Sequence, residues 1–313
     1  MAENLSGTVA AADRKRTRLV SFLGIRSYQP TRHSFPDGTL GAETKYVCRA
    51  LGAFVQVEEI EIVATEEAKA AHGREIVADL RAANLPAPNF HSIPLGKSEA
   101  ELWRQFDAVK HLLRPAPGTD TVFDVTHAFR SQPFFAAATA SFVRAVDREP
   151  APLRVYYAAF EAQKDGVTPV WELTPFIDLV DWAQSMMMFL RTGRSAGIAE
   201  RTTELAKKLA REQPDKRQAE APNLRRLGAA LREFGGNLET IRTGDLLLPG
   251  FDGSAERLAA ALQEARQSAA AIPPLADVLD RLQSEMIEPL LGASDHLASG
   301  AGHRALAGLA RLY

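Results

Sequence analysis

The chain has 313 residues, of which 46% are hydrophobic and 24% charged, a mixture typical of a soluble globular protein with two domains. Its formal net charge of -2 argues against the binding of long nucleic acid, which needs an extended basic face. A single cysteine, Cys48, excludes a disulfide framework. No apolar run approaches the roughly 20 residues that cross a bilayer, so we expect a cytoplasmic protein without membrane contact.

Short apolar runs and amphipathic stretches alternate in the first half of the chain. Residues 1–16 are polar and rich in alanine, and we interpret them as a disordered leader. The predicted strands are residues 19–24, 57–63, 90–95, 121–125, 153–160 and 168–173, and the predicted helices are residues 65–83, 98–113 and 131–146. Thr65 is expected to cap the first helix, and Ser98 the second in a capping box with Glu101. Residues 17–176 are thus predicted to form an α/β domain with a Rossmann-like, mostly parallel sheet and helices on both faces.

After residue 176 the strand patterns stop. Helical periodicity continues over residues 177–191, 201–211, 223–243, 254–271 and 274–291, which predicts an all-α domain over residues 177–313. Acidic and basic side chains nearly balance there, so this part has no charge signature of a nucleic-acid-binding domain. Residues 303–313 show a helical pattern without a capping residue after it, and the natural chain either ends there or continues.

Two predicted loops lie where a doubly wound sheet binds its ligands. Such sheets bind ligands beyond the carboxyl ends of the strands, at the point where the strand order reverses. In a sheet of order 3-2-1-4-5, the loop of residues 24–28 and the loop of residues 126–131 are neighbours at this point. The first loop lacks the glycine spacing of a dinucleotide-binding turn, so NAD and similar cofactors are disfavoured and no cofactor is expected.

The second loop carries groups that suit an anion and a base. Ser131 can cap the next helix and leave backbone N–H groups free, and Arg130 adds a permanent cation. Thr126 offers a hydroxyl, and His127 offers a ring that can donate and accept. Asp124, at the end of the strand, is expected to support the loop through backbone N–H groups. The same residues also occur in ordinary strand-end turns, so the spacing alone leaves both interpretations open.

Residues 124–131, Asp-Val-Thr-His-Ala-Phe-Arg-Ser, resemble the Asp-x-Thr-His-Gly-Phe-Arg-Ser motif of one branch of the CRISPR-associated Rossmann-fold (CARF) proteins of type III systems. Further patterns of that branch are similar to residues 22–28, 44–46, 156–161 and 169–173, so that the resemblance covers roughly residues 17–185. Ala128 departs from the usual glycine. If that position needs a positive φ, the loop differs locally.

The resemblance implies a homodimer that senses a cyclic oligoadenylate, with cyclic tetra-adenylate favoured, and that controls an effector allosterically. The ligand would lie in a pocket on the two-fold axis. By carry-over, the ligand-binding residues are Gly24, Ser27, Tyr28, Thr126, His127, Phe129, Arg130 and Ser131, with Asp124 as structural support. Many relatives carry a C-terminal HEPN ribonuclease with an Arg-x4-6-His motif. Residues 177–313 lack this motif, so we interpret them as an interdomain or partial HEPN-like region. The sequence leaves open whether the chain is an enzyme.

Two alternatives stay open as well. The pocket could cleave its own ligand, as in some members of the wider family, by attack of a 2′-hydroxyl on the neighbouring phosphate. Thr126 or Ser131 would then orient the hydroxyl, and Arg130 would lie near the phosphate. Otherwise the chain could be a ligand-responsive regulator that acts through its helical domain.

Other conspicuous residues have simpler interpretations. The three methionines at residues 186–188 are expected to fill a core or an interface, and the apolar residues 177–190 are a candidate dimer-interface helix. His296 and His303 have no third ligand nearby, so no metal site is expected. A solvated helix face is expected for the basic residues Arg201, Lys207, Lys208 and Arg211.

Overall fold

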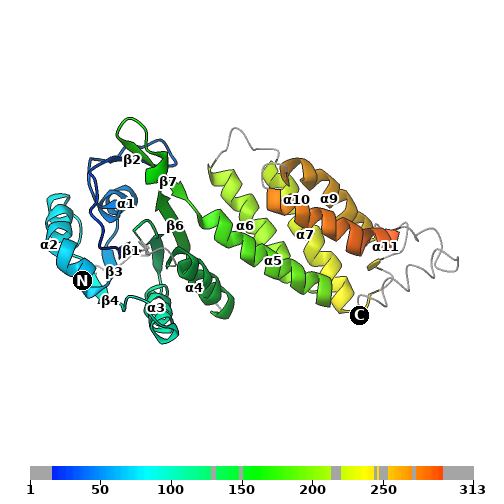
Figure 1. Cartoon of the computed structure of the whole chain (residues 1–313). Helices are drawn as coiled ribbons and strands as arrows, with labels where there is room; N and C mark the ends of the chain where they lie inside the picture. Colours follow the sequence, from blue (N-terminus) through cyan, green and yellow to red (C-terminus); the bar gives the residue numbers. More distant parts are fainter. Residues whose placement is uncertain are drawn as a thin grey trace, which may run out of the picture. The chain divides into compact units, whose positions relative to one another are not determined.

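The computed structural model describes residues 16–127, 132–147, 151–212, 220–242, 245–246, 253–269 and 273–291 (Figure 1). They form two compact units, one that extends to Asp178 and one that begins at Leu179. Strand β1 begins at Arg16, the last residue of the predicted leader, and residues 1–15 lie outside the described ranges, as do residues 303–313.

A seven-stranded sheet, in the order β2-β7-β6-β5-β1-β3-β4, forms the centre of the first unit. Its strands are β1 (Arg16–Leu23), β2 (Arg32–Ser34), β3 (Glu59–Ala64), β4 (Asn89–Ser92), β5 (Thr119–Asp124), β6 (Leu153–Ala158) and β7 (Val167–Glu172). Strands β4, β3, β1, β5 and β6 are parallel neighbours. Strand β7 runs antiparallel to β6, and β2 pairs with β7 in parallel. The predicted α/β fold with a mostly parallel sheet is confirmed.

Helices cover both faces of this sheet (Figure 1). They are α1 (Val47–Val55), α2 (Glu66–Ala82), α3 (Glu99–Leu112) and α4 (Gln132–Val146). Because successive side chains of a strand point to opposite faces, β1 contributes to two hydrophobic cores. Leu19 and Leu23 pack in the core that includes α1 and α2, whereas Val20 and Phe22 pack in the core that includes α3 and α4.

The helix starts follow their capping residues, with one difference from the prediction. Thr65 Oγ1 accepts a hydrogen bond from the backbone N of Ala68 (3.2 Å), and Ser98 Oγ accepts one from the backbone N of Glu101 (3.3 Å). The carboxylate of Glu101 does not close a capping box on Ser98. It accepts hydrogen bonds from the backbone N–H groups of Gly96 and Lys97, and so holds the turn before the helix.

Neither β2 nor α1 is predicted from the sequence. Strand β2 has three residues, which is too short to show an alternating pattern. Helix α1 has nine residues, Tyr46 at its start forms no side-chain cap, and neither of its end turns carries a charge that favours a helix, so no start or stop signal marks it. Cys48 is a buried free cysteine, and burial raises the pKa of its thiol.

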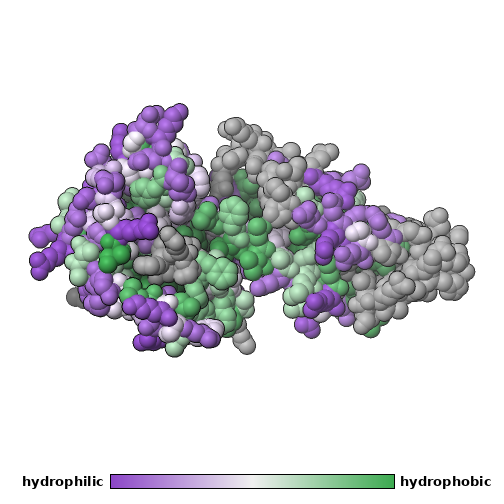
Figure 2. All heavy atoms as spheres, viewed as in Figure 1, coloured by the Kyte–Doolittle hydropathy of each residue, from purple (hydrophilic) through white to green (hydrophobic). Residues whose placement is uncertain are grey.

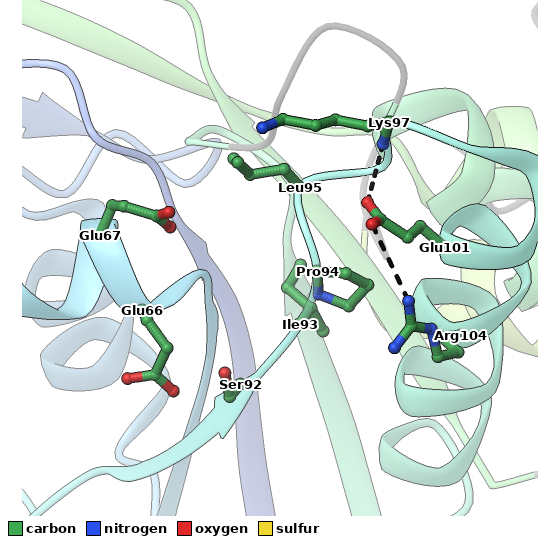
Figure 3. Close-up of a pocket in the computed structure, with 9 residues that line it drawn as sticks. All are labelled: Glu66, Glu67, Ser92, Ile93, Pro94, Leu95, Lys97, Glu101 and Arg104. Atoms are coloured by element: carbon green, nitrogen blue, oxygen red, sulfur yellow. Dashed lines mark hydrogen bonds and ion pairs between the residues drawn. The ribbon is translucent and has the colours of Figure 1, made fainter.

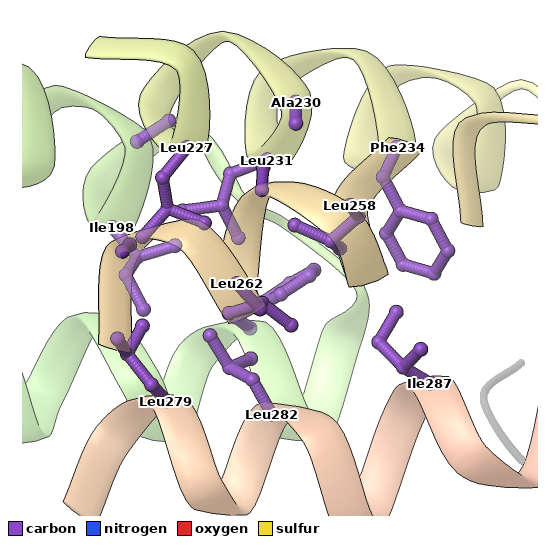
Figure 4. Close-up of a cluster of buried hydrophobic side chains, with 14 of the residues drawn as sticks. Ile198, Leu227, Ala230, Leu231, Phe234, Leu258, Leu262, Leu279, Leu282 and Ile287 are labelled. Carbon is purple, nitrogen blue, oxygen red and sulfur yellow. The ribbon is translucent and has the colours of Figure 1, made fainter. Parts of the chain in front are cut away.

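The second unit is helical throughout its described residues. Helix α5 (Thr174–Thr192) enters it from the first unit, and the rest comprises α6 (Ala196–Glu212), α7 (Glu220–Glu239), α9 (Ser254–Ala269), α10 (Pro273–Leu282), the π-helical turn η2 (Gln283–Ile287) and α11 (Glu288–Leu291). Leu227 and Leu231 of α7 and Leu258 and Leu262 of α9 meet Leu282 of α10 in one apolar core (Figure 4). The predicted all-α region after the sheet is confirmed.

Two side-chain predictions in the second unit have different outcomes. Met186 is buried in the helical core, whereas Met187 and Met188 are about half exposed. Arg201 does not lie on a solvated face. Its guanidinium Nη1 lies 3.2 Å from Oδ2 of Asp181, which is buried, and its Nε donates to Ser185 Oγ. The prediction for Arg201 was wrong because a buried carboxylate requires a cationic partner that no helical period reveals.

Two general features concern the described ranges as a whole. None of their helices combines the length and apolar character that are needed to span a bilayer. No group of three His, Cys, Asp or Glu side chains in them has an arrangement that would hold a metal ion. His296 and His303 lie outside these ranges.

Candidate ligand-binding site

Strands β1 and β5 are neighbours at the centre of the sheet, paired from Arg16 with Thr119 to Ser21 with Asp124. The strand order reverses between them, because β3 and β4 continue on the β1 side and β6 on the β5 side. The loops that follow β1 and β5 therefore meet at one edge of the sheet. This is the place where doubly wound folds bind ligands.

Gly24 lets these two loops approach closely. A Cβ atom at Gly24 would lie 3.0 Å from the carbonyl oxygen of His127 and 3.1 Å from the hydroxyl of Tyr28. That hydroxyl accepts a hydrogen bond from the backbone N of Gly24 and donates one to its carbonyl oxygen, both at 2.8 Å. The absence of a side chain at Gly24 is thus a condition for this geometry.

Asp124 and Thr126 hold the second loop onto the sheet. Asp124 is fully buried; its Oδ2 accepts a hydrogen bond from Ser21 Oγ (2.7 Å), and its Oδ1 accepts one from the backbone N of Thr126 (2.9 Å). Burial raises the pKa of Asp124 more than these hydrogen bonds lower it. Thr126 Oγ1 accepts a hydrogen bond from the backbone N of Ala158 in β6 (2.8 Å). Its hydroxyl oxygen is therefore already engaged within the fold.

A row of rings runs along this edge of the sheet. The ring centroid of His127 lies 4.1 Å from that of Tyr28 and 5.8 Å from that of Phe160. The Tyr28 ring in turn lies 4.8 Å from His72, and the Phe160 ring 6.2 Å from His33. Burial, with smaller effects of His33 and His72, lowers the pKa of His127 to about 3. At neutral pH His127 is therefore an uncharged ring that can stack and form hydrogen bonds.

The two loops and the turn after β6 enclose a pocket of about 600 Å³. It is lined by Gly24, Ile25, Arg26, Ser27, Tyr28, Gln29, Thr126, His127, Phe160 and Gln163. Five of the predicted ligand-binding residues thus lie around one cavity. The other three, Phe129, Arg130 and Ser131, lie outside the described residues.

Phe160 and Gln163 were missed from the sequence. They belong to the 3-10 turn η1 (Phe160–Ala162) and the residue after it, and no local motif marks them. They reach the pocket because β6 is the neighbour of β5 in the sheet. Only the sheet order reveals that contact, although the similarity of residues 156–161 to the CARF pattern was a signal that the turn matters.

A second cavity, of about 430 Å³, lies beyond the carboxyl ends of β3 and β4 (Figure 3). Glu66 and Glu67 of α2 lie on one side of it, and Lys97, Glu101 and Arg104 lie on the other. Its three carboxylates outnumber the two cations, so it is less suited to a polyanion than the first pocket, whose charged lining residue is Arg26. The sequence does not predict this cavity.

No protein-family model matches this chain. Over 106 residues it is 29% identical to the CRISPR-associated protein MJ1674 of Methanocaldococcus jannaschii. The matched residues make up 33% of this chain and 16% of that relative, so the chain spans about a sixth of its length.

Proposed function

We propose that the chain is a sensor of CRISPR-based antiviral defence that binds a cyclic oligoadenylate between the loops after β1 and β5. The observation that carries this proposal is the pocket itself: both loops that resemble the CARF pattern border one cavity at the point where the strand order reverses. The rings of Tyr28, His127 and Phe160 suit the stacking of bases. Arg26 offers a cation for phosphate.

The pocket size supports a ligand shared by two chains. A cavity of about 600 Å³ is in the range that holds one drug-sized molecule. A ring of four adenylates is considerably larger than such a molecule. A two-fold axis would bring two pockets together and match a ring with an even number of identical units, so the proposed active species is a homodimer.

The first unit has an exposed apolar surface that would serve such a dimer. Apolar side chains gather over α4 in Figure 2. Trp103 on α3 is 60% exposed, and Phe134 and Phe142 on α4 are 77% and 43% exposed. Exposed aromatic clusters of this kind mark interaction sites in soluble proteins. We propose this surface as a dimer contact, in addition to the apolar residues 177–190 that the sequence singles out.

Isothermal titration calorimetry with cyclic tetra-adenylate and cyclic hexa-adenylate tests the proposal. We expect sub-micromolar binding with the four-membered ring favoured, at one ring per two chains. The absence of both heat and thermal stabilisation with either ring would contradict it. The same incubation with a labelled ring separates a sensor, which retains the ring intact, from a ring nuclease, which releases a linear product.

A further inference from the structure

Gln163 connects the pocket to a buried polar group. Its side chain is exposed at the pocket wall, yet its Nε2 lies 2.8 Å from Oγ1 of Thr31, which is 1% exposed. Thr31 directly precedes β2. In the sheet, β7 lies between β2 and β6, so Thr31 and the turn after β6 belong to strands that are not neighbours. The Nε2 end of the Gln163 amide is therefore anchored at Thr31, in a residue that lines the pocket.

The hydroxyl of Thr31 determines which end of the amide is anchored. Its single proton has two carbonyl oxygens within reach, of Gly166 at 3.0 Å and of Arg32 at 3.1 Å, and both can only accept. Thr168 Oγ1, at 3.0 Å, can donate to Thr31. Once the Thr31 proton is used on a carbonyl, its oxygen can only accept from Gln163. The amide NH₂ thus faces Thr31, and Oε1 remains for the pocket, where no described residue forms a hydrogen bond to it.

The other groups beside Gln163 do not distinguish one base from another. Phe160, three residues earlier in the same turn, and the neutral ring of His127 offer π faces, and every base can stack on such faces. An acceptor held in a fixed direction does distinguish them, because it pairs with an amino group and opposes a carbonyl oxygen.

We propose that Gln163 is a specificity-determining residue: its Oε1 accepts a hydrogen bond from the exocyclic amino group of a bound purine. This inference rests on the proposed function and identifies the exocyclic amino group as the feature of the base that the pocket recognises. A 6-amino purine, such as adenine, donates from its amino group to Oε1 of Gln163, so that both groups are hydrogen-bonded. A 6-oxo purine sets two acceptors against each other, and inversion of the amide would break the Nε2–Thr31 hydrogen bond and turn the Thr31 proton away from the carbonyl groups.

The experiment compares two rings of equal size, cyclic tetra-adenylate and its counterpart made of inosine monophosphate, by calorimetry on the full chain. We expect the wild type to bind the inosine ring about tenfold or more weakly, as expected for one unpaired buried acceptor. Gln163→Ala should weaken adenylate binding and bring the two affinities to within about threefold. Thr31→Val, which frees the amide to rotate, should also reduce the discrimination although Gln163 is retained.

Lys164→Ala is the matched control. Lys164 follows Gln163 in the chain and is exposed, but it does not line the pocket, and the two rings carry the same charge, so its loss should leave the wild-type ratio of the two affinities unchanged. Equal binding of both rings by the wild type would overturn the role of Gln163 and leave the proposed function intact. Undiminished discrimination in Gln163→Ala would do the same. Failure of both rings to bind would overturn the proposed function, and this inference with it.

Discussion

At the scale of single residues, the candidate site depends on one glycine that keeps two loops in contact. The obstacle to a side chain at Gly24 is the backbone carbonyl of His127, which cannot rotate away as a flexible side chain would. Tyr28 adds a second restraint, because its hydroxyl closes two hydrogen bonds on the Gly24 backbone. A substitution there must move one loop relative to the other.

Gly24→Ala is therefore expected to destabilise the chain by about 1–3 kcal/mol, as overpacking does, and to weaken ligand binding through the loop shift. Urea unfolding and calorimetry measure the two effects. Gly73→Ala in α2 is a suitable control, since a Cβ there would make ordinary contacts with Lys69 of the same helix and with Phe90 of β4. Its stability should be unchanged or slightly higher, because alanine favours a helix more than glycine does. Equal behaviour of the two variants would show that the loops can adjust freely.

His33 makes stability depend on pH. It is fully buried on β2, neither of its ring nitrogens has a hydrogen-bond partner among the described residues, and burial lowers its pKa to about 4. The unfolded chain binds the proton with a pKa near 6.5. The stabilising effect is thus complete above pH 6.5 and is lost as the pH falls towards 4, by about 1.4 kcal/mol per pH unit.

His33→Leu should remove this contribution. Chemical unfolding at several pH values between 4.5 and 7 gives the slope of the unfolding free energy against pH. The slope of the variant should be smaller than that of the wild type by about 1.4 kcal/mol per pH unit, which corresponds to one proton fewer bound on unfolding. The comparison with the wild type isolates His33, since the remaining titrating groups are common to both. Identical slopes would mean that the His33 ring is solvated or paired.

At the scale of the elements, helices α6 and α7 approach through glycines. A Cβ atom at Gly228 would lie 2.6 Å from Thr203 Oγ1 and 3.0 Å from the carbonyl oxygen of Ala199, and one at Gly235 would collide with Ser195. Gly236, the next residue of α7, has nothing within 4 Å of such a position. Two adjacent glycines thus have opposite roles in the same helix.

We expect Gly235→Ala to lower the free energy of unfolding by about 1–3 kcal/mol, because the helices must separate to admit the methyl group. Gly236→Ala should raise it by up to about 1 kcal/mol through helix propensity alone. Thermal unfolding of both variants, followed by circular dichroism, checks the difference in sign. A loss of stability in both, or in neither, would contradict the close approach of α6 and α7.

The elements that could be predicted from the sequence are those with a clear period or cap. Helices α2 and α3 have a capping residue, and β1 and β5 are largely buried strands whose short apolar stretches are bounded by polar residues. Helix α1 could not be predicted because it is short and starts without a side-chain cap, and β2 because three residues show no period. In the site, Gly24 and His127 were predicted from the loops that carry them, whereas Gln163 reaches the pocket only through the pairing of β6 with β5.

At the scale of the whole molecule, the proposed shared pocket requires a second chain. The exposed aromatic side chains of α3 and α4 form a connected set, because the Phe106 ring lies 5.7 Å from Trp103 and 5.5 Å from Phe142. Water is an unfavourable neighbour for such a set. The same surface also includes Phe134 near the start of α4, the helix that follows the second ligand loop.

We therefore expect a homodimer without ligand, and a monomer when Phe134 and Phe142 are both replaced by serine. Light scattering measures the mass, and calorimetry on the same samples should show that the double variant binds cyclic tetra-adenylate at least tenfold more weakly, because each chain then offers only half of the pocket. Val77→Ser is the control: Val77 is 39% exposed on α2, which packs in the other core of the sheet, so this variant should remain a dimer. A wild-type chain that stays monomeric with and without the ring would contradict the shared pocket. A double variant that stays dimeric would instead assign the dimer contact to α5.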